Sequence, residues 1–203
     1  MVVKYDKVYQ FKIELDELKP VIWRRIQVPA SYSFWDLHVA IQDSMGWLDC
    51  HLHQYMIQNP VLKKKCCIGL PSDEDELLEY KPLAGWTMFI ADWFSAENPT
   101  ARYEYDFGDC WNHIITLEDI LPREKGVKYP LCLAGERACP PEDVGSTCGY
   151  ERFVKIMANP KDEEYKEMLA WYGRKYEPDK FEPGKVKFTN PGIRLRRMFS
   201  GGI

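Results

Sequence analysis

The segment YEYDFGDCWNH, residues 103–113, mixes alternating aromatic residues with groups that can do chemistry. The carboxylates of Glu104 and Asp106 and the imidazole of His113 are ligands for divalent metal ions, and they are also groups that transfer protons. Asp109 and a cysteine lie between them. The segment therefore indicates either a reactive site or a tight hairpin whose polar groups fix its shape.

A two-residue turn at Gly108-Asp109, with glycine first, predicts how the side chains of this hairpin divide. Counting outward from the turn places Asp106 opposite Trp111 and Glu104 opposite His113, and opposed residues share a face. These four residues form either a catalytic or metal-binding patch beside an indole, or an ordinary solvent-facing side. The other face, which we assign to the core, carries Tyr103, Tyr105, Phe107, Cys110, Asn112 and Ile114.

A second charged group, Arg24, lies in a strand whose pattern is apolar. In VIWRRIQV, residues 21–28, the side chain of Arg24 shares a face with Ile22 and Ile26. A buried guanidinium requires a carboxylate or a bound anion as its partner. We expect a buried ion pair that fixes the sheet, with an anion-binding arginine as the alternative. The candidate carboxylate partners are Asp106, Asp109, Glu142 and Asp143.

Two histidines and an acidic loop supply the remaining candidate groups. His51 and His53 belong to HLHQYMI, residues 51–57, and two acidic residues end the sequence PPED at residues 140–143. We expect these groups to line one aromatic and charged ligand-binding cleft with Arg24 and the polar face of the hairpin. The predicted cleft residues are Arg24, His51, His53, Glu104, Asp106, Trp111, His113, Glu142 and Asp143.

The cysteines favour reduced thiols. Seven cysteines and an N-terminus without the apolar core of a signal peptide indicate a cytoplasmic protein rather than a disulfide-linked one. Cys132, Cys139 and Cys148 are separated by six and eight residues, which is not the paired spacing of a zinc ribbon. We expect buried thiols there, and a structural zinc that also uses His113 is the alternative.

Composition limits the classes of partner. The chain has 203 residues, of which 45% are hydrophobic and 14% aromatic, so it can form a substantial core. The formal net charge of −4 provides no overall attraction to nucleic acid. The most apolar run, residues 86–94, is about half of the ~20 residues that a membrane-spanning helix needs. We therefore expect neither a nucleic acid nor a membrane as partner.

The elements that would position these groups can be read from periodicity. Alternation predicts antiparallel strands at 8–15 and 21–28, a strand at 51–57, and a hairpin of strands 101–107 and 111–118. The sequence Ser33-Phe34-Trp35-Asp36 fits a capping box, so a helix is expected from there to Gly46. Residues 86–94 fit either a helix or a strand.

The rest of the chain predicts fewer strands and more helices. We expect a solvated loop and a short acidic helix within residues 58–82, an irregular connection around residues 130–141, and helices at 149–158 and 162–176. Paired hairpins and grouped helices favour an α+β fold, an antiparallel sheet with one inserted helix and a C-terminal group of helices packed on it. Residues 1–183 are expected to form a single domain, followed by a partly basic tail, residues 184–203.

Several motifs in order resemble the plasmid pRiA4b ORF-three-like family, and the resemblance covers roughly residues 8–183. They are LKPVIWRRIQVPA (18–30), MGW with HLHQY (45–55), YEYDFGDCWNH (103–113), YPLCLAGERACPPEDVG (129–145), CGYERF (148–153) and KYEPDKFEP (175–183). The resemblance implies an α+β fold and no particular activity. Two departures, Cys110 and the stretch from Val144 to Thr147, count against a metal site at those positions.

These observations favour a non-catalytic binding or adaptor module for a protein or small-molecule partner, with no cofactor. The aromatic residues supply the kind of rigid surface that is enriched at recognition sites. One alternative is a metal-dependent hydrolase or nuclease-like enzyme that uses Asp106, Asp109 and His113, with a divalent metal as its cofactor. A second alternative is a nucleic-acid-associated factor of mobile elements, for which the tail supplies Arg194, Arg196 and Arg197.

Overall fold

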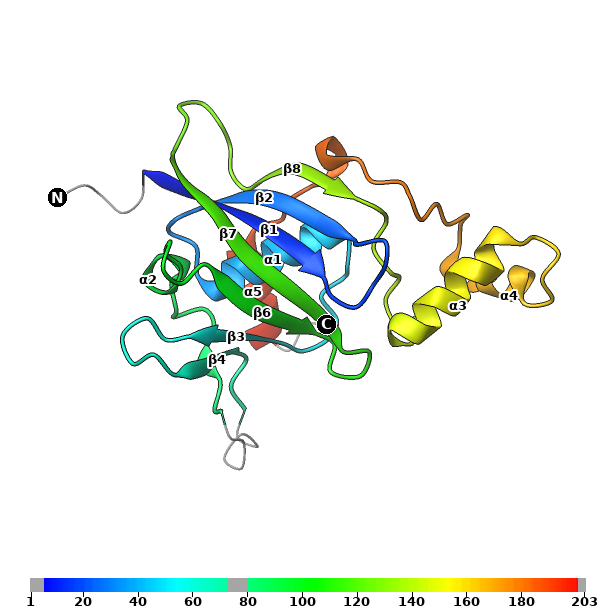
Figure 1. Cartoon of the computed structure of the whole chain (residues 1–203), viewed down its shortest axis with the longest axis horizontal. Coiled ribbons are helices and arrows are strands. Elements are labelled where there is room, and N and C mark those ends of the chain that lie inside the picture. The colour runs from blue at the N-terminus through cyan, green and yellow to red at the C-terminus, as the bar shows by residue number, and fades with distance from the viewer. Residues whose placement is uncertain (1–5, 73–79, 201–203) are drawn as a thin grey trace.

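An eight-stranded sheet organises the chain (Figure 1). The computed structural model describes residues 6–72 and 80–200. The strand order is β5-β4-β3-β6-β7-β1-β2-β8, with β4 and β5 parallel and the other neighbours antiparallel. The strands are β1 (Lys7–Leu15), β2 (Trp23–Pro29), β3 (His53–Gln58), β4 (Lys65–Gly69), β5 (Leu83–Ala84), β6 (Thr100–Tyr105), β7 (Trp111–Pro122) and β8 (Leu131–Glu136).

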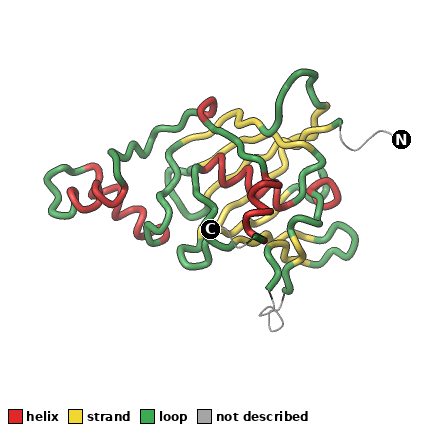
Figure 2. Tube along the Cα trace, turned by 180° about the vertical axis from the view of Figure 1, so that it is seen from behind, coloured by secondary structure: helices red, strands yellow, loops and turns green. Residues whose placement is uncertain are grey.

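The helices divide into two groups. α1 (Phe34–Met45) and α5 (Pro191–Phe199) cover one face of the sheet, and both lie in front of the strands when the molecule is seen from behind (Figure 2). α3 (Ser146–Ala158) and α4 (Tyr165–Tyr172) stand together beside the sheet, and we call this pair the helical arm (Figure 1). The short elements are α2 (Ile90–Trp93) and a 3-10 turn, η2 (Pro183–Lys185). No helix in the described ranges is both long and apolar enough to cross a membrane.

The main core lies between the sheet and α1. Phe11 and Ile13 of β1 are completely buried, as are Phe34 and Leu37 of α1. The opposite face of the sheet is polar, with Arg25 of β2 paired to Glu118 of β7, and it is open to solvent. One apolar and one polar face explain the period-two pattern of these strands. The predicted α+β class and the antiparallel pairing of β1 with β2 are confirmed.

α1 begins and ends where its sequence predicts. Ser33 Oγ accepts a hydrogen bond from the backbone N–H of Asp36. The carboxylate of Asp36 in turn accepts one from the backbone N–H of Ser33, which completes a capping box. Gly46 ends the helix in the left-handed conformation, with φ of 94°, which glycine adopts at no steric cost. This stop places Met45, Gly46 and Trp47 beside the PPED loop, which matters for the site below.

Two strands appear where loops were expected. β4 is a five-residue strand next to β3, and β8 pairs with the outer side of β2 inside the predicted irregular connection. Both strands are short and lack alternation, so local periodicity does not predict them. Pairing with neighbouring strands stabilises them instead. Within the 86–94 segment only Ile90–Trp93 is regular, as the short helix α2. The expected acidic helix within residues 72–79 falls almost entirely on residues outside the described ranges.

The predicted hairpin register is wrong by one residue. The turn spans five residues, Asp106 to Cys110, and Tyr105 pairs with Trp111 while Tyr103 pairs with His113. Asp106 and Cys110 have left-handed φ angles of 57° and 56°, which a two-residue glycine turn does not contain. Since a shift of one residue moves every side chain to the opposite face, Trp111 and His113 enter the core.

The C-terminal segment folds back onto the sheet domain. Asn190 caps α5 by accepting the N–H of Ile193, and Trp35 Nε1 donates to the carbonyl oxygen of Pro191. Arg194 bridges Asp43 of α1 and Asp49 of the following loop. One of the three arginines expected on a free tail is therefore engaged. The division of the chain at residue 183 stays a prediction.

Candidate functional site

A groove of about 540 Å³ lies between the C-terminal end of α1, the PPED loop and the helical arm. It adjoins a second hollow of about 520 Å³, and the two share seven lining residues: Met45, Gly46, Ala138, Tyr172, Arg174, Lys180 and Phe181. We call the pair the junction groove, because it follows the boundary between the sheet and the segments around the arm. Five aromatic residues line it: Trp47, Trp171, Tyr172, Tyr176 and Phe181.

Arg24 lies at the inner wall of this groove and is 1% exposed. Its guanidinium donates to the carbonyl oxygens of Ser44, Trp23 and Glu136 at 2.8–3.0 Å, and the ring of Phe181 covers it at 3.6 Å. Burial lowers the pKa of Arg24. Among the described residues no carboxylate lies within salt-bridge distance, so the expected ion pair is wrong: backbone carbonyls and a ring replace it.

The PPED loop is tied to the end of α1 and to the sheet. Trp47 Nε1 donates to the carbonyl oxygen of Pro140 at 3.0 Å, and the N–H of Leu48 donates to Glu142 Oε1 at 2.7 Å. The hydroxyl of Tyr105 donates to the same carboxylate oxygen at 3.1 Å. Burial raises the pKa of Glu142, although these two donors oppose that shift. Glu142 is therefore a half-buried anchor at the edge of the groove.

Beside this anchor, three segments meet around one imidazole. His51 Nε2 lies 3.1 Å from Asp143 Oδ1 and 3.5 Å from Asp106 Oδ2. Neither contact has hydrogen-bond geometry, so the ring lies between two carboxylates without donating to either. Asp106 is 7% exposed and comes from the hairpin turn, whereas Asp143 is exposed and comes from the PPED loop. The structure thus brings together three of the predicted site residues.

Three other predicted site residues lie in the core. His113 is 1% exposed, its Nδ1 atom lies 2.9 Å from the carbonyl oxygen of Trp111, and burial lowers its pKa to about 4. Trp111 is also completely enclosed. His53 stacks on His38 at 3.5 Å, and burial, together with His38, lowers the pKa of His53 well below its ordinary value. The neutral imidazoles of these two histidines are packing groups.

The remaining predicted carboxylates have local roles. Glu104 lies on the polar face of the sheet, where it accepts the side-chain amide of Gln54 at 2.7 Å and does not pair with His113. Asp109 accepts the N–H of Gly145 at 3.0 Å and so joins the hairpin to the start of α3. Within the described ranges, no metal-ligand group contains Asp109, His113 or Cys132. The triad expected for a hydrolase does not assemble.

Sequence reasoning missed a buried polar network behind the sheet. His38 Nδ1 lies 2.8 Å from the hydroxyl of Tyr103, and its Nε2 lies 2.7 Å from Asp49 Oδ1. Asp49 also forms an ion pair with Arg194, whose Nη1 lies 3.2 Å from Asp49 Oδ2. The side-chain amide of Gln42 donates to the hydroxyl of Tyr103 at 3.0 Å. No local motif marks these residues, because His38 reads as one position of an amphipathic helix. The network links α5 to the sheet and does not open into the junction groove.

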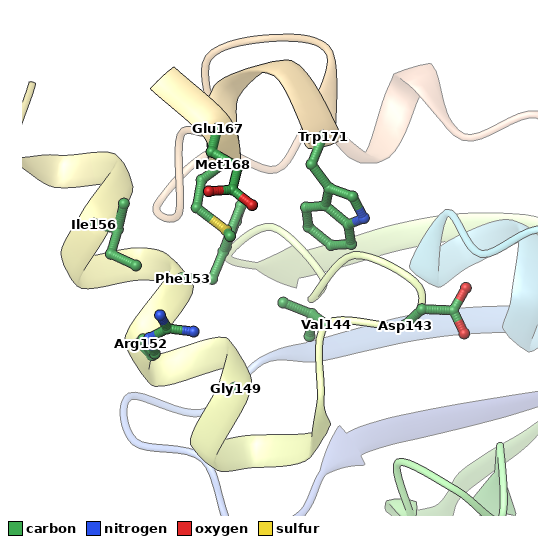
Figure 3. Close-up of a pocket in the computed structure, with 9 residues that line it drawn as sticks. All are labelled: Asp143, Val144, Gly149, Arg152, Phe153, Ile156, Glu167, Met168 and Trp171. Carbon is green, nitrogen blue, oxygen red and sulfur yellow. The ribbon is translucent and has the colours of Figure 1, made fainter. Parts of the chain in front are cut away.

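The charge of the groove comes from its outer wall. Arg174 has the hydroxyl of Tyr172 as a hydrogen-bond partner at 3.3 Å, and Lys180 pairs with the exposed Glu177 at 3.1 Å. Trp171, 48% exposed, borders both this groove and a smaller hollow of about 270 Å³ within the arm. Figure 3 shows Trp171 reaching from α4 toward the loop that carries Val144 and Asp143. Aromatic surface and the guanidinium of Arg174, which has no carboxylate partner among the described residues, therefore meet at this wall.

Comparison with known proteins identifies one matching family, a related sequence and a similar crystal structure. The sequence profile of the plasmid pRiA4b ORF-3-like protein family matches residues 7–185. An uncharacterized protein, y4hQ, from Sinorhizobium fredii (strain NBRC 101917 / NGR234), is 33% identical over 168 residues, which are 82% of this chain and 81% of that protein. The crystal structure of MM3350, a protein of unknown function from Methanosarcina mazei Go1, is 41% identical, has a TM-score of 0.83, and covers 91% of this chain and 99% of that one.

Proposed function

The chain belongs to the plasmid pRiA4b ORF-3-like protein family, and from this premise we propose that it is a non-catalytic binding module whose site is the junction groove. The observation that carries the proposal is the composition of the groove wall. Trp171 and Phe181 offer ring surface, and Arg174 offers a cation that has no carboxylate partner in the described ranges. A cytoplasmic location remains a prediction from the sequence.

The chemistry of this wall favours a partner segment with an aromatic side chain and a carboxylate. Tryptophan and arginine dominate the energetics of recognition sites, because they bury a large area and form directed hydrogen bonds. A guanidinium binds a carboxylate through two parallel hydrogen bonds. Since the two hollows adjoin and share lining residues, an extended segment of a partner protein can occupy both of them.

Glu142, at the other end of the groove, indicates in which direction a bound segment would lie. Glu142 is held by Leu48 and Tyr105, so its charge is fixed in place rather than free to move toward Arg174. A bound segment would therefore orient with its carboxylate toward Arg174 and Lys180 and away from Glu142. Electrostatic complementarity of this kind sets orientation and specificity more than affinity.

The proposal is tested by selecting random displayed peptides on the purified protein. We expect enriched sequences that combine an aromatic residue with aspartate or glutamate. Trp171→Ala and Arg174→Glu should each weaken binding of the selected peptides by at least ~10-fold, as truncation of a central contact does. Phe89→Ala is the matched control, because Phe89 is equally exposed, at 47%, and lies outside the groove.

The groove substitutions should weaken peptide binding without lowering the stability of the fold. Trp171 is half exposed, so Trp171→Ala should unfold at nearly the same urea concentration as the wild type. The proposal fails when no sequence is enriched, or when Phe89→Ala weakens the selected peptides as much as Trp171→Ala does.

A further inference from the structure

His51, Asp106 and Asp143 have the arrangement of three ligands around one metal ion. The residues come from separate segments: the loop after α1, the hairpin turn and the PPED loop. One atom of each lies within 4.8 Å of the other two. The imidazole nitrogen is 3.1 Å from one carboxylate oxygen and 3.5 Å from the other. Ligands of a tetrahedral zinc ion, bound at ~2.1 Å, lie about 3.4 Å apart, between these two values.

Two of the three ligand atoms, His51 Nε2 and Asp106 Oδ2, have no hydrogen-bond partner among the described residues. Asp106 Oδ1 accepts the N–H groups of Gly108 and Asp109 at 2.9 and 3.3 Å, while Oδ2 points toward His51 with no hydrogen-bond donor among the described residues. The carboxylate is nine-tenths buried, so water does not fully solvate it. His51 Nε2 is itself shielded from solvent and has no hydrogen-bond partner. A buried polar atom in this state indicates an absent partner.

The surrounding structure holds the three segments in place. The N–H of Asp106 donates to the carbonyl oxygen of Leu52 at 2.9 Å, which joins the hairpin turn to the loop of His51. Asp109 joins the same turn to Gly145, two residues after Asp143. The ring of His51 packs edge-on against Tyr105. Contacts of this kind orient metal ligands in proteins.

We propose that His51 Nε2, Asp106 Oδ2 and Asp143 Oδ1 bind one divalent transition-metal ion, with Zn²⁺ as the ion that fits best. An imidazole and two carboxylates suit Zn²⁺ or Mn²⁺, and three protein ligands leave a fourth position open. Asp143 also lines the junction groove, so a ligand group in the groove can reach that position. The metal site is independent of the proposed peptide binding, and either can fail alone.

A neighbouring group, Cys50, His51 and Glu142, also satisfies the distance condition. Glu142 is less suited as a ligand, since Leu48 and Tyr105 already donate to its carboxylate. Cys50 is exposed and its sulfur faces the hydroxyl of Tyr105 at 3.9 Å. The two arrangements differ in one testable property: only the group of Cys50, His51 and Glu142 would place a thiolate on the metal.

Titration of the full-length, chelator-treated protein with Zn²⁺ tests the site by calorimetry. We expect about one equivalent to bind, and His51→Gln, Asp106→Asn and Asp143→Asn should each weaken it by at least ~10-fold. Asp106→Asn is designed to keep the fold, because asparagine tolerates the left-handed φ and still accepts the turn N–H groups. Asp119→Asn, an exposed carboxylate on β7, is the matched control and should bind as the wild type does.

Substituting Co²⁺ for Zn²⁺ separates this site from the seven free thiols of the chain. Our assignment predicts d–d absorption without a thiolate-to-cobalt charge-transfer band, and no change in Cys50→Ser. Binding of less than about 0.1 equivalent, a thiolate band, or equal affinity in the wild type and the three ligand variants would each overturn the proposal.

Discussion

Arg24 shows that a buried charge can be neutralised by backbone dipoles instead of by a carboxylate. Its guanidinium joins three chain segments, because the carbonyl oxygens it bonds belong to β2, to the last turn of α1 and to β8. The Ser44 carbonyl is one of the groups that a helix leaves unpaired at its C-terminus. Arg24 therefore caps α1 from the side, and Phe181 closes the space above it.

This role predicts a graded loss of stability. Arg24→Ala should lower the free energy of unfolding by about 4 kcal/mol, since it empties volume and leaves three buried carbonyls without a donor. Arg24→Met should cost about 2 kcal/mol, because it keeps the aliphatic volume. Urea denaturation measures both. Arg25→Met, the neighbour with an exposed ion pair, should cost less than ~1 kcal/mol. Equal losses for Arg24→Ala and Arg24→Met would contradict this account.

The buried histidines make stability depend on pH. The folded-state pKa of His113 is about 4, below its ordinary value near 6.5, because burial penalises the charged ring. Between these values the unfolded chain binds a proton that the folded chain does not. The stability from the neutral ring is complete above about pH 6.5 and is lost as the pH falls toward 4, where the loss amounts to ~3 kcal/mol. His53 acts in the same direction.

Urea denaturation at pH 7.5 and pH 5.0 tests this linkage. The wild type should lose more stability between these two pH values than His113→Gln does, by about 2 kcal/mol, since glutamine does not titrate. An equal loss in the two proteins would show that His113 is not buried as a neutral ring.

At the scale of single residues, the sequence predicts which residues are of interest better than it predicts what surrounds their side chains. The apolar pattern around Arg24 correctly indicated burial, yet its partners are main-chain atoms that no sequence pattern marks. His51, Asp106 and Asp143 were all predicted as site residues, and they do lie together. His113 and Trp111 were assigned to the wrong face, because two left-handed residues in the turn change the count by one.

The elements that carry clear local signals are those the sequence predicts well. β1, β2 and α1 have strict periodicity or a capping box, and their observed bounds agree with the prediction within a few residues. β4 and β8 are held by neighbours distant in sequence, so local periodicity does not reveal them. α5 is short and basic, and its position depends on acidic residues of α1 and of the loop after it.

The docking of α5 gives a prediction at the scale of one element. Arg194→Ala should lower the free energy of unfolding by about 1–3 kcal/mol, because the carboxylate of Asp43 is 5% exposed and loses its cation. Arg197→Ala, an exposed position on the same helix, should change it by less than ~0.5 kcal/mol.

Hydrogen exchange adds a local readout to this comparison. Amides of residues 193–199 should exchange faster in Arg194→Ala than in Arg197→Ala, because only the first change releases the helix from α1. The opposite order would mean that the ion pairs do not hold α5 in place.

For the whole molecule, the main consequence of the fold is the boundary between the sheet and the helical arm. The PPED loop enters the arm and residues 173–182 leave it, so both connections border the junction groove. The groove therefore combines segments that are distant in the sequence, which explains why sequence reasoning named its Glu142 and Asp143 but not Trp171 or Arg174. These last two look like one face of an ordinary amphipathic helix and the residues after it.

The central claim, that the groove is the binding site, is tested most directly by amide NMR during titration with phenylacetate, a probe with one ring and one carboxylate. At millimolar concentrations the largest chemical-shift changes should fall on residues 45–48, 138–143 and 171–182, and Arg174→Glu should abolish them. Largest changes elsewhere, such as at residues 83–94, or an unchanged response in Arg174→Glu, would contradict the account.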